Sequence, residues 1–155
     1  NMNKKIQLES GLTYQNSKHD VAINYSTELA AKKEFLRTPQ TYGYATLDYF
    51  INDRISIMAN VIHTGSMDLV HMGGAPNQIE DEYIASEVFN VISIKATYLQ
   101  KIEPIALKCE YSIGVKNITN DYQKDFDTSK NRDSNFIYGP SIPRMIYFDI
   151  KVKSL

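Results

Sequence analysis

The sequence predicts an all-β protein, built as an antiparallel up-and-down meander of about seven strands. Side chains alternate between apolar and polar along much of the chain, which is the period of a β-strand. All 5 prolines fall in connections or at the starts of alternating segments, where no ladder hydrogen bond is lost. The chain has 155 residues, a net charge of −1 and 1 cysteine, which suits a single domain without a disulfide framework and gives no basic excess for nucleic acid.

The clearest alternation runs from Ile105 to Asn117. Because successive residues of a strand point to opposite sides, this segment has one apolar face and one polar face. The apolar face consists of Ile105, Leu107, Cys109, Tyr111, Ile113 and Val115. Cys109 is therefore expected to be an ordinary buried thiol. The same pattern predicts further strands of about ten residues over 4–15, 20–28, 40–51, 54–65, 87–99 and 144–153.

The expected connections alternate between short and long. The short ones are 16–19, 52–54 and 100–104, and the long ones are 29–39, 66–87 and 118–143. Transmembrane β-barrels have short turns on one rim and longer loops on the other, and strands of about ten residues can cross a bilayer when tilted. The segment 28–34 favours helix by composition but is too short to form a stable helix alone, so it is expected in a loop.

Three tyrosines suggest a membrane interface. Tyr14, Tyr49 and Tyr98 each lie on the apolar face of a predicted strand, a few residues before a predicted short turn. They are expected at one height, as an interfacial aromatic girdle requires. Chance placement of a common strand residue is the alternative.

Alternation alone leaves two kinds of barrel open. A soluble ligand-binding barrel buries its apolar face, whereas a membrane barrel turns that face outward. Charged residues in the middle of the polar faces, such as Lys95, Lys108, Glu110 and Asp149, together with the segregation of connections by length, favour a wet lumen and the membrane alternative.

The last 45 or so residues carry the most specific pattern. The segments GVKNITNDYQKDFD (114–127) and RDSNFIYGPSIPRMIYFDIKV (132–152) resemble the C-terminal end of TonB-dependent outer-membrane receptors of the Bacteroidetes type. RTPQTYGYATLDY (37–49) and HTGSMDLVHMGG (63–74) are similar to earlier parts of the same barrel. Two positions depart from the family pattern: Asp149 stands where glycine is usual, and Leu155 is out of phase with the apolar residues of the last strand.

The resemblance implies that residues 1–155 are the C-terminal segment of a transmembrane β-barrel, 22-stranded in the full family, with the plug domain absent. It implies a location in the outer membrane of a Gram-negative cell and energy supplied by the TonB complex through the missing N-terminal part. Outer-membrane lipid and a large nutrient ligand are then the expected partners, and a surface lipoprotein fits as a further one. The end strands, 3–15 and 144–155, are expected to pair by closing the sheet on itself or with another copy.

No catalytic constellation or cofactor motif is found, so the chain is expected not to be an enzyme. His63 is expected at the interface and His71 in a solvated loop, and neither has neighbouring residues that would complete a metal site. Oxygen-bearing side chains at every second residue suggest a calcium loop: Asp125, Asp127, Ser129, Asn131 and Asp133. Its sixth position is Lys130 instead of glycine, and its twelfth is Phe136 instead of glutamate. Basic neighbours can pair these acids instead, so no metal site is expected.

The expected function is therefore active uptake of a large scarce nutrient, such as a metal chelate, a corrinoid or a glycan. The long loops would contact it through aromatic side chains, which suit stacking on a bulky ligand. These candidate contacts are Tyr83, Tyr122, Phe126, Phe136 and Tyr138. A soluble β-barrel that binds a small ligand in an apolar interior is the alternative function, and a surface adhesin is a third.

Overall fold

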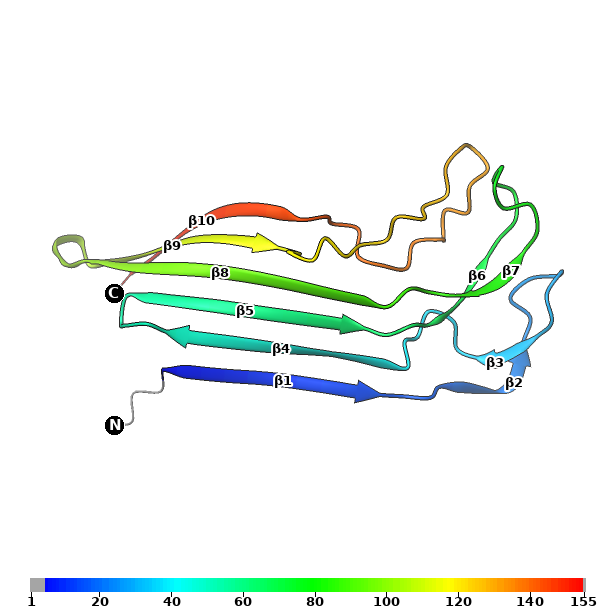
Figure 1. Ribbon diagram of the computed structural model, residues 1–155, viewed down its shortest axis with the longest axis horizontal. Helices are drawn as coiled ribbons and strands as arrows, with labels where there is room; N and C mark the ends of the chain where they lie inside the picture. Colours follow the sequence, from blue (N-terminus) through cyan, green and yellow to red (C-terminus); the bar gives the residue numbers. More distant parts are fainter. Residues whose placement is uncertain (1–4, 155) are drawn as a thin grey trace.

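The computed structural model describes residues 5–154. Ten strands form three antiparallel sheets, of which the largest has six strands in a single layer (Figure 1). The predicted all-β class and antiparallel pairing are confirmed, although the strands do not form one meander of seven. The main sheet contains, side by side in this order, β1 (Ile6–Tyr14), β4 (Thr41–Phe50), β5 (Ile55–Thr64), β8 (Phe89–Ile102), β9 (Leu107–Lys116) and β10 (Met145–Ser154).

The strand predicted over 20–28 is present only in part, over residues 18–23, and it lies outside the main sheet. β1 pairs with β4 along its whole length, from Ile6 opposite Tyr49 to Tyr14 opposite Thr41. β2 (Lys18–Ile23) pairs only with β3 (Lys32–Glu34), in a small sheet beyond the end of β1. Residues 16–19 are therefore not a tight turn between neighbouring strands of the main sheet. The local alternation identified extended chain, but it carries no information about which strand becomes the partner.

Connections in the main sheet alternate strictly in length. The short ones are 51–54 and 103–106, the latter containing a 3-10 helix, η1 (Glu103–Ile105). The long ones are 15–40, 65–88 and 117–144, and all three lie at the same end of the sheet, at the right in Figure 1. The second long connection contains the hairpin of β6 (Asp68–His71) and β7 (Glu82–Ala85). The predicted segregation of short and long connections is thus confirmed and is more regular than the sequence suggested.

The register places most of the large apolar residues of the six strands on one face, called here the apolar face. One row across it consists of Ile6, Tyr49, Ile57, Ala96, Ile113 and Phe148. The next row consists of Leu8, Leu47, Ala59, Ile94, Val115 and Ile146. Large side chains on this face are strongly exposed, at 66 % for Leu8 and 73 % for Ile146. Monomeric soluble proteins rarely expose so broad an apolar surface, so this face requires a covering.

The opposite face, called here the charged face, carries every Asp, Glu, Lys and Arg of these six strands. They are Glu9, Asp48, Lys95, Lys101, Lys108, Glu110, Lys116, Asp149, Lys151 and Lys153. Glu110 is paired with Lys153 at 3.2 Å and with Lys108 at 3.7 Å. All charged side chains of the sheet thus share one face, which also carries some apolar residues such as Met58, Ile62 and Val91.

The strands are staggered along the sheet. The midpoint of β1, Ser10, is level with Val61 of β5, whereas Asp149 near the midpoint of β10 is level with Ser56. The strand midpoints thus shift by about five residues along the strands from β1 to β10. Each residue advances about 3.4 Å along a strand, and neighbouring strands lie about 4.8 Å apart. The line through the strand midpoints is consequently inclined by roughly 35° to the perpendicular of the strands.

The sheet does not close on itself. β1 and β10 are its two edge strands, and they are not paired with each other. The expectation of self-closure is therefore not met in the single chain. The buried hydrophobic core is small and lies mainly at the end with the long connections, where Met67, Leu69 and Phe136 pack together against Ile84 and Tyr138.

Candidate functional site

The three long connections form one packed assembly, called here the loop cluster. Its hydrophobic centre combines Met67 and Leu69 from the second connection with Phe136 from the third. Phe89, at the start of β8, is 1 % exposed and packs against Tyr138 with a ring-centroid distance of 6.0 Å. Because these residues come from separate connections, the loops hold one another in place.

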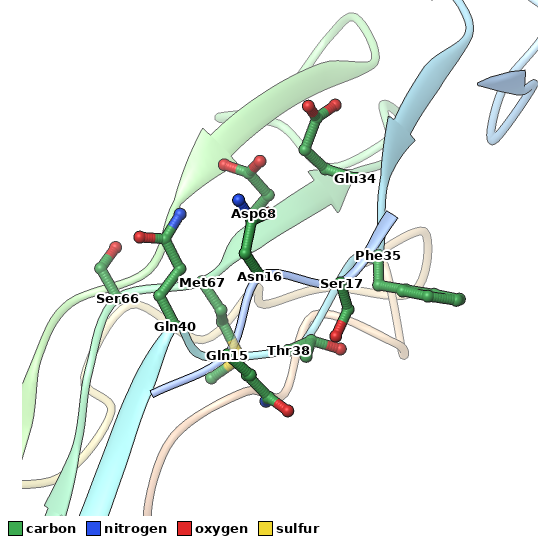
Figure 2. A pocket seen from close by; sticks show the side chains of 10 residues that line it. All are labelled: Gln15, Asn16, Ser17, Glu34, Phe35, Thr38, Gln40, Ser66, Met67 and Asp68. Carbon is green, nitrogen blue, oxygen red and sulfur yellow. The ribbon is translucent and has the colours of Figure 1, made fainter. Parts of the chain in front are cut away.

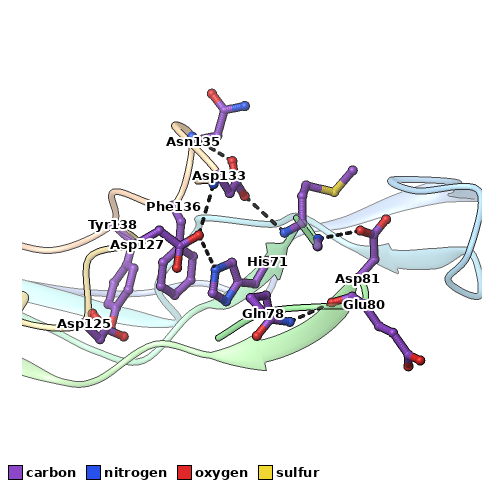
Figure 3. Close-up of polar contacts among 12 residues, drawn as sticks. His71, Gln78, Glu80, Asp81, Asp125, Asp127, Asp133, Asn135, Phe136 and Tyr138 are labelled. Carbon is purple, nitrogen blue, oxygen red and sulfur yellow. Dashed lines mark hydrogen bonds and ion pairs between the residues drawn. The ribbon is translucent and has the colours of Figure 1, made fainter. Parts of the chain in front are cut away.

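A buried histidine–aspartate pair lies next to this centre (Figure 3). His71 Nε2 and Asp127 Oδ2 are 2.9 Å apart, with 8 % and 1 % of the side chains exposed. The His71 ring stacks on Phe136 at 3.7 Å between centroids and 5° between planes. Burial raises the pKa of Asp127, but hydrogen bonds from His71 and from the Asp133 backbone outweigh burial, so this pKa lies below its usual value. The predicted solvated position of His71 is therefore wrong.

The acid-rich segment 125–133 is organised by protein hydrogen bonds. Asp125 accepts from the Tyr138 hydroxyl at 2.7 Å, and Asp133 accepts from the backbone N–H groups of Met72 at 3.1 Å and Asn135 at 2.8 Å (Figure 3). Burial and then the bond to Asp125 raise the pKa of Tyr138 well above its usual value. Within residues 5–154, no group of three or more His, Cys, Asp or Glu side chains is arranged to hold a metal ion. The carboxylates thus act as braces of the loop.

Gln123 is the fully buried polar residue that organises the third connection. Its Nε2 donates to the Phe136 carbonyl at 3.1 Å, and its Oε1 accepts from the backbone N–H groups of Tyr138 at 2.8 Å and Gly139 at 3.1 Å. A polar group that is buried must be hydrogen-bonded to be tolerated, and here three bonds satisfy one amide. Nothing in the local sequence around Gln123 indicates this role, since its partners are 13 to 16 residues away.

The first connection is tied to the other two. Arg37, in the left-handed region at φ 58°, donates to the backbone carbonyls of Asn135 and Ile137. Lys32 lies 3.3 Å from Asp68 and 4.5 Å from the centre of the Tyr83 ring. These contacts join β3 to the hairpin of β6 and β7.

Asp81 forms a second link between the first connection and the second. The hydroxyl of Ser26 donates to its carboxylate, and the backbone N–H of Gly73 donates to the same group at 2.7 Å. The Ser26 bond and then the Gly73 bond lower the pKa of Asp81. The carboxylate therefore stays charged and links the first connection to the second over the ordinary pH range.

The candidate ligand contacts occupy different environments. Phe136 and Tyr138 belong to the interior of the loop cluster, and Tyr83 donates its hydroxyl to the Ala30 carbonyl at 2.9 Å. Tyr122 is half-buried with Lys124 Nζ 5.5 Å from its ring centre, and Phe126 is exposed. In this arrangement Phe126 and Tyr122 remain available to a ligand, whereas Phe136 is committed to packing.

Two of the three girdle tyrosines lie near each other. Tyr98 and Tyr49 lie toward the end with the short turns, two residues apart in the register of β5. Tyr111 lies opposite Tyr98 with its ring stacked at 6.4 Å, although it was not among the residues expected in the girdle. Tyr14 lies at the other end of the strands, opposite Thr41. Its expected place beside the other two is wrong, because β1 is followed by a long connection.

Two hollows open between the loops. The first has a volume of about 260 Å³ and is lined by side chains from the end of β1, the segment before β4 and the start of β6, as Figure 2 shows. Its lining includes amides, hydroxyls and the acids Glu34 and Asp68 beside Phe35 and Met67. The second has a volume of about 520 Å³ and lies between His19, Arg37 and Asp133. The lining of the first hollow is mainly polar, whereas that of the second is mainly apolar, with Phe35, Leu36 and Val70.

The motif GVKNITN (114–120) fixes the conformation of the third connection. Asn117 and Asn120 adopt left-handed φ values of 51° and 54°, which asparagine tolerates better than most residues. The Asn117 amide donates to the Ile142 carbonyl at 2.9 Å, and Asn120 accepts from the Arg144 backbone N–H at 3.0 Å. Arg144 Nε in turn donates to the Ile118 carbonyl at 3.0 Å. The motif thus fastens the two ends of the third connection together.

No described helix is long and apolar enough to cross a membrane. Comparison with known proteins gives no further assignment: no family model, curated protein or solved structure matches this chain.

Proposed function

We propose that this chain forms the C-terminal part of the wall of a TonB-dependent outer-membrane receptor. The separation of charge in the main sheet carries the proposal. All charged side chains of its six strands lie on one face, and large apolar side chains are exposed on the other. In a transmembrane β-barrel the apolar face contacts lipid and the opposite face lines a wet lumen.

Two further features support the same proposal. The stagger of the strands corresponds to a tilt of roughly 35°, and strands of membrane barrels are tilted by about 35–45°. The three long connections gather at one end of the sheet and the short ones at the other, which is the arrangement of extracellular loops and periplasmic turns. In this proposal β1 and β10 pair with further strands of the barrel, because open edges template association.

The orientation of the faces can be tested with a single tryptophan. The chain contains no tryptophan, so a single introduced tryptophan is the only source of tryptophan fluorescence. Phe148→Trp places it on the apolar face and Tyr147→Trp on the charged face, one residue away at nearly the same depth. In vesicles that contain bromolipids, the fluorescence of Phe148→Trp should be strongly quenched and that of Tyr147→Trp should be weakly quenched. Equal quenching, or no association with lipid, would refute the proposal.

Location and topology can be tested on intact cells. An epitope inserted after Lys130, an exposed residue of the third connection, should bind antibody at the cell surface. The same epitope inserted after Asp53, in the short turn at the opposite end, should bind antibody only after the outer membrane is opened. Detection of both epitopes, or of neither, on intact cells would contradict the proposed orientation.

The transported nutrient is proposed to be large and scarce: a metal chelate, a corrinoid or a glycan. Disruption of the gene that encodes the chain should slow growth when one of these classes is limiting and leave growth on the other two unchanged. Unchanged growth with every class would contradict a role in uptake of such a nutrient.

A further inference from the structure

A groove on the charged face lies outside the loop hollows described above. It has a volume of about 510 Å³, which lies in the range of sites for small organic molecules. Its floor belongs to the sheet, and its roof is the segment Pro140–Ile142 at the end of the third connection. The floor residues include Thr46, Met58, Asn60, Ile62, Val91, Ser93, Lys116 and Tyr147.

A polar strip crosses the floor. Thr46 lies opposite Asn60 and Asn60 lies opposite Ser93, while Lys116 follows Val115, the partner of Ile94, and therefore lies beside Ser93. Asn60 Nδ2 donates to Thr46 Oγ1 at 2.9 Å, so its carbonyl oxygen faces away from that bond. The strip thus offers hydroxyl and amide groups in line with one ammonium group at its end.

Apolar walls flank the strip. Ile62 and Val91 form one side together with the roof, and Met58 and Tyr147 form the other. The Tyr147 ring lies over Gly114, where an added Cβ would come within 2.6 Å of it. Gly114 therefore allows the ring to lie flat along the sheet. Asn117 holds the roof through its bond to the Ile142 carbonyl.

The groove carries the positive charge of Lys116 without a negative charge to balance it. Lys116 has no carboxylate partner within 4 Å among the described residues, and no Asp or Glu is among the residues that line the groove. Its Nζ lies 5.4 Å from the centre of the Tyr147 ring, which positions the ammonium above an aromatic surface. Other lysines of the same face, such as Lys108 and Lys153, are paired with Glu110.

We propose that this groove binds an organic carboxylate with an apolar, ring-containing body. The carboxylate pairs with Lys116 and accepts a hydrogen bond from the hydroxyl group of Ser93 beside it. The apolar body lies between Tyr147 and the wall formed by Ile62 and Ile142. This site is a property of the charged face itself and stands apart from the nutrient taken up in the proposed function.

The test uses 2-naphthoate as the probe and 2-naphthamide as its neutral counterpart. Binding to the folded chain is followed by the fluorescence anisotropy of the naphthalene group, with protein-free lipid as the blank. Lys116→Gln should weaken naphthoate binding about tenfold, as expected for loss of a charge-assisted hydrogen bond, and should leave naphthamide binding unchanged. Lys116→Arg should retain naphthoate binding.

The matched control is Lys101→Gln, which removes a lysine from the same face at the other end of β8, outside the groove. It should leave naphthoate binding unchanged, and inorganic phosphate should not compete because it lacks an apolar body. Equal loss of affinity in Lys101→Gln and Lys116→Gln would overturn the proposal, as would equal affinity of naphthoate and naphthamide for the unaltered chain. The tryptophan-quenching test of the faces can fail or succeed independently of this measurement.

Discussion

Arginine substitution at two adjacent positions of β5 tests the polarity of the sheet most directly. Ile57 lies on the apolar face opposite Tyr49 and Ala96, and Met58 lies on the charged face opposite Asp48 and Lys95. The two residues lie at the same depth in a central strand. In the proposed membrane arrangement we expect Ile57→Arg to destabilise the lipid-inserted protein and Met58→Arg to be tolerated, since only the first would place a guanidinium against hydrocarbon.

The size of the difference follows from the two environments. An arginine on the lipid side near the bilayer midplane costs about 2–4 kcal/mol. At position 58 the new guanidinium lies between an acid and a base, so attraction to Asp48 and repulsion from Lys95 offset each other in a wet lumen, and the change should stay below about 1 kcal/mol. Ile57→Arg should therefore shift the folding equilibrium by a factor of about 5 or more relative to Met58→Arg.

The assay is a urea titration of the chain in lipid vesicles, with Phe148→Trp as the common fluorescent background. The two variants should show the same slope and different midpoints, because the slope reports the surface exposed on unfolding. Equal midpoints for Ile57→Arg and Met58→Arg would refute the assignment of the faces. A lower midpoint for Met58→Arg would reverse it and would favour a soluble barrel with the apolar face inside.

Three further variants probe the third connection and its anchors. Asp127→Asn should loosen the loop cluster by up to about 3 kcal/mol, since it leaves His71 without its charged partner, and hydrogen exchange of residues 67–71 should rise. The pKa of Asp127 is lower in the folded chain than in the unfolded chain, so its stabilising contribution is present above the unfolded-state pKa and is lost as pH falls through the folded-state pKa. Protease resistance of the loops should therefore fall at acid pH in the unaltered chain and change less in Asp127→Asn. Gly114→Ala should cost about 1–3 kcal/mol, because its Cβ meets the Tyr147 ring, and Gly114→Ala combined with Tyr147→Ala should recover most of that loss in the urea midpoint. Asn117→Ala should cost about 2 kcal/mol through a strained φ and a lost tether, with cleavage near Ile142 as the readout and an unchanged cleavage rate as the contrary result.

Strand positions could be predicted from sequence because the period of two is a local property. Ile105 to Asn117 shows it, and β9 lies over Leu107–Lys116 as expected. Partner choice could not be predicted at residues 20–28, where Val21 and Ile23 alternate like core residues but lie in a two-stranded sheet beyond the main one. Pairing depends on contacts with distant strands, and a single segment does not encode them.

The site was less predictable than the fold. His71 meets Asp127 across 56 positions of sequence, and Arg37 meets Ile137 across 100. Contacts between residues so far apart in the chain leave no recognisable pattern in the sequence around either residue. The sequence could not separate Phe136, which packs inside, from Phe126, which is exposed, because both lie among polar neighbours in an irregular segment.

The bonds that hold the third connection end largely on main-chain atoms. Gln123 binds backbone groups of Phe136, Tyr138 and Gly139, and Arg37 binds backbone carbonyls of Asn135 and Ile137. Every residue type supplies the same carbonyl, so the outward side chains at 135 and 137 can be exchanged without loss of these anchors. In evolutionary terms a few fixed anchors can preserve the conformation of the loop while the side chains at its exposed positions change without disturbing it.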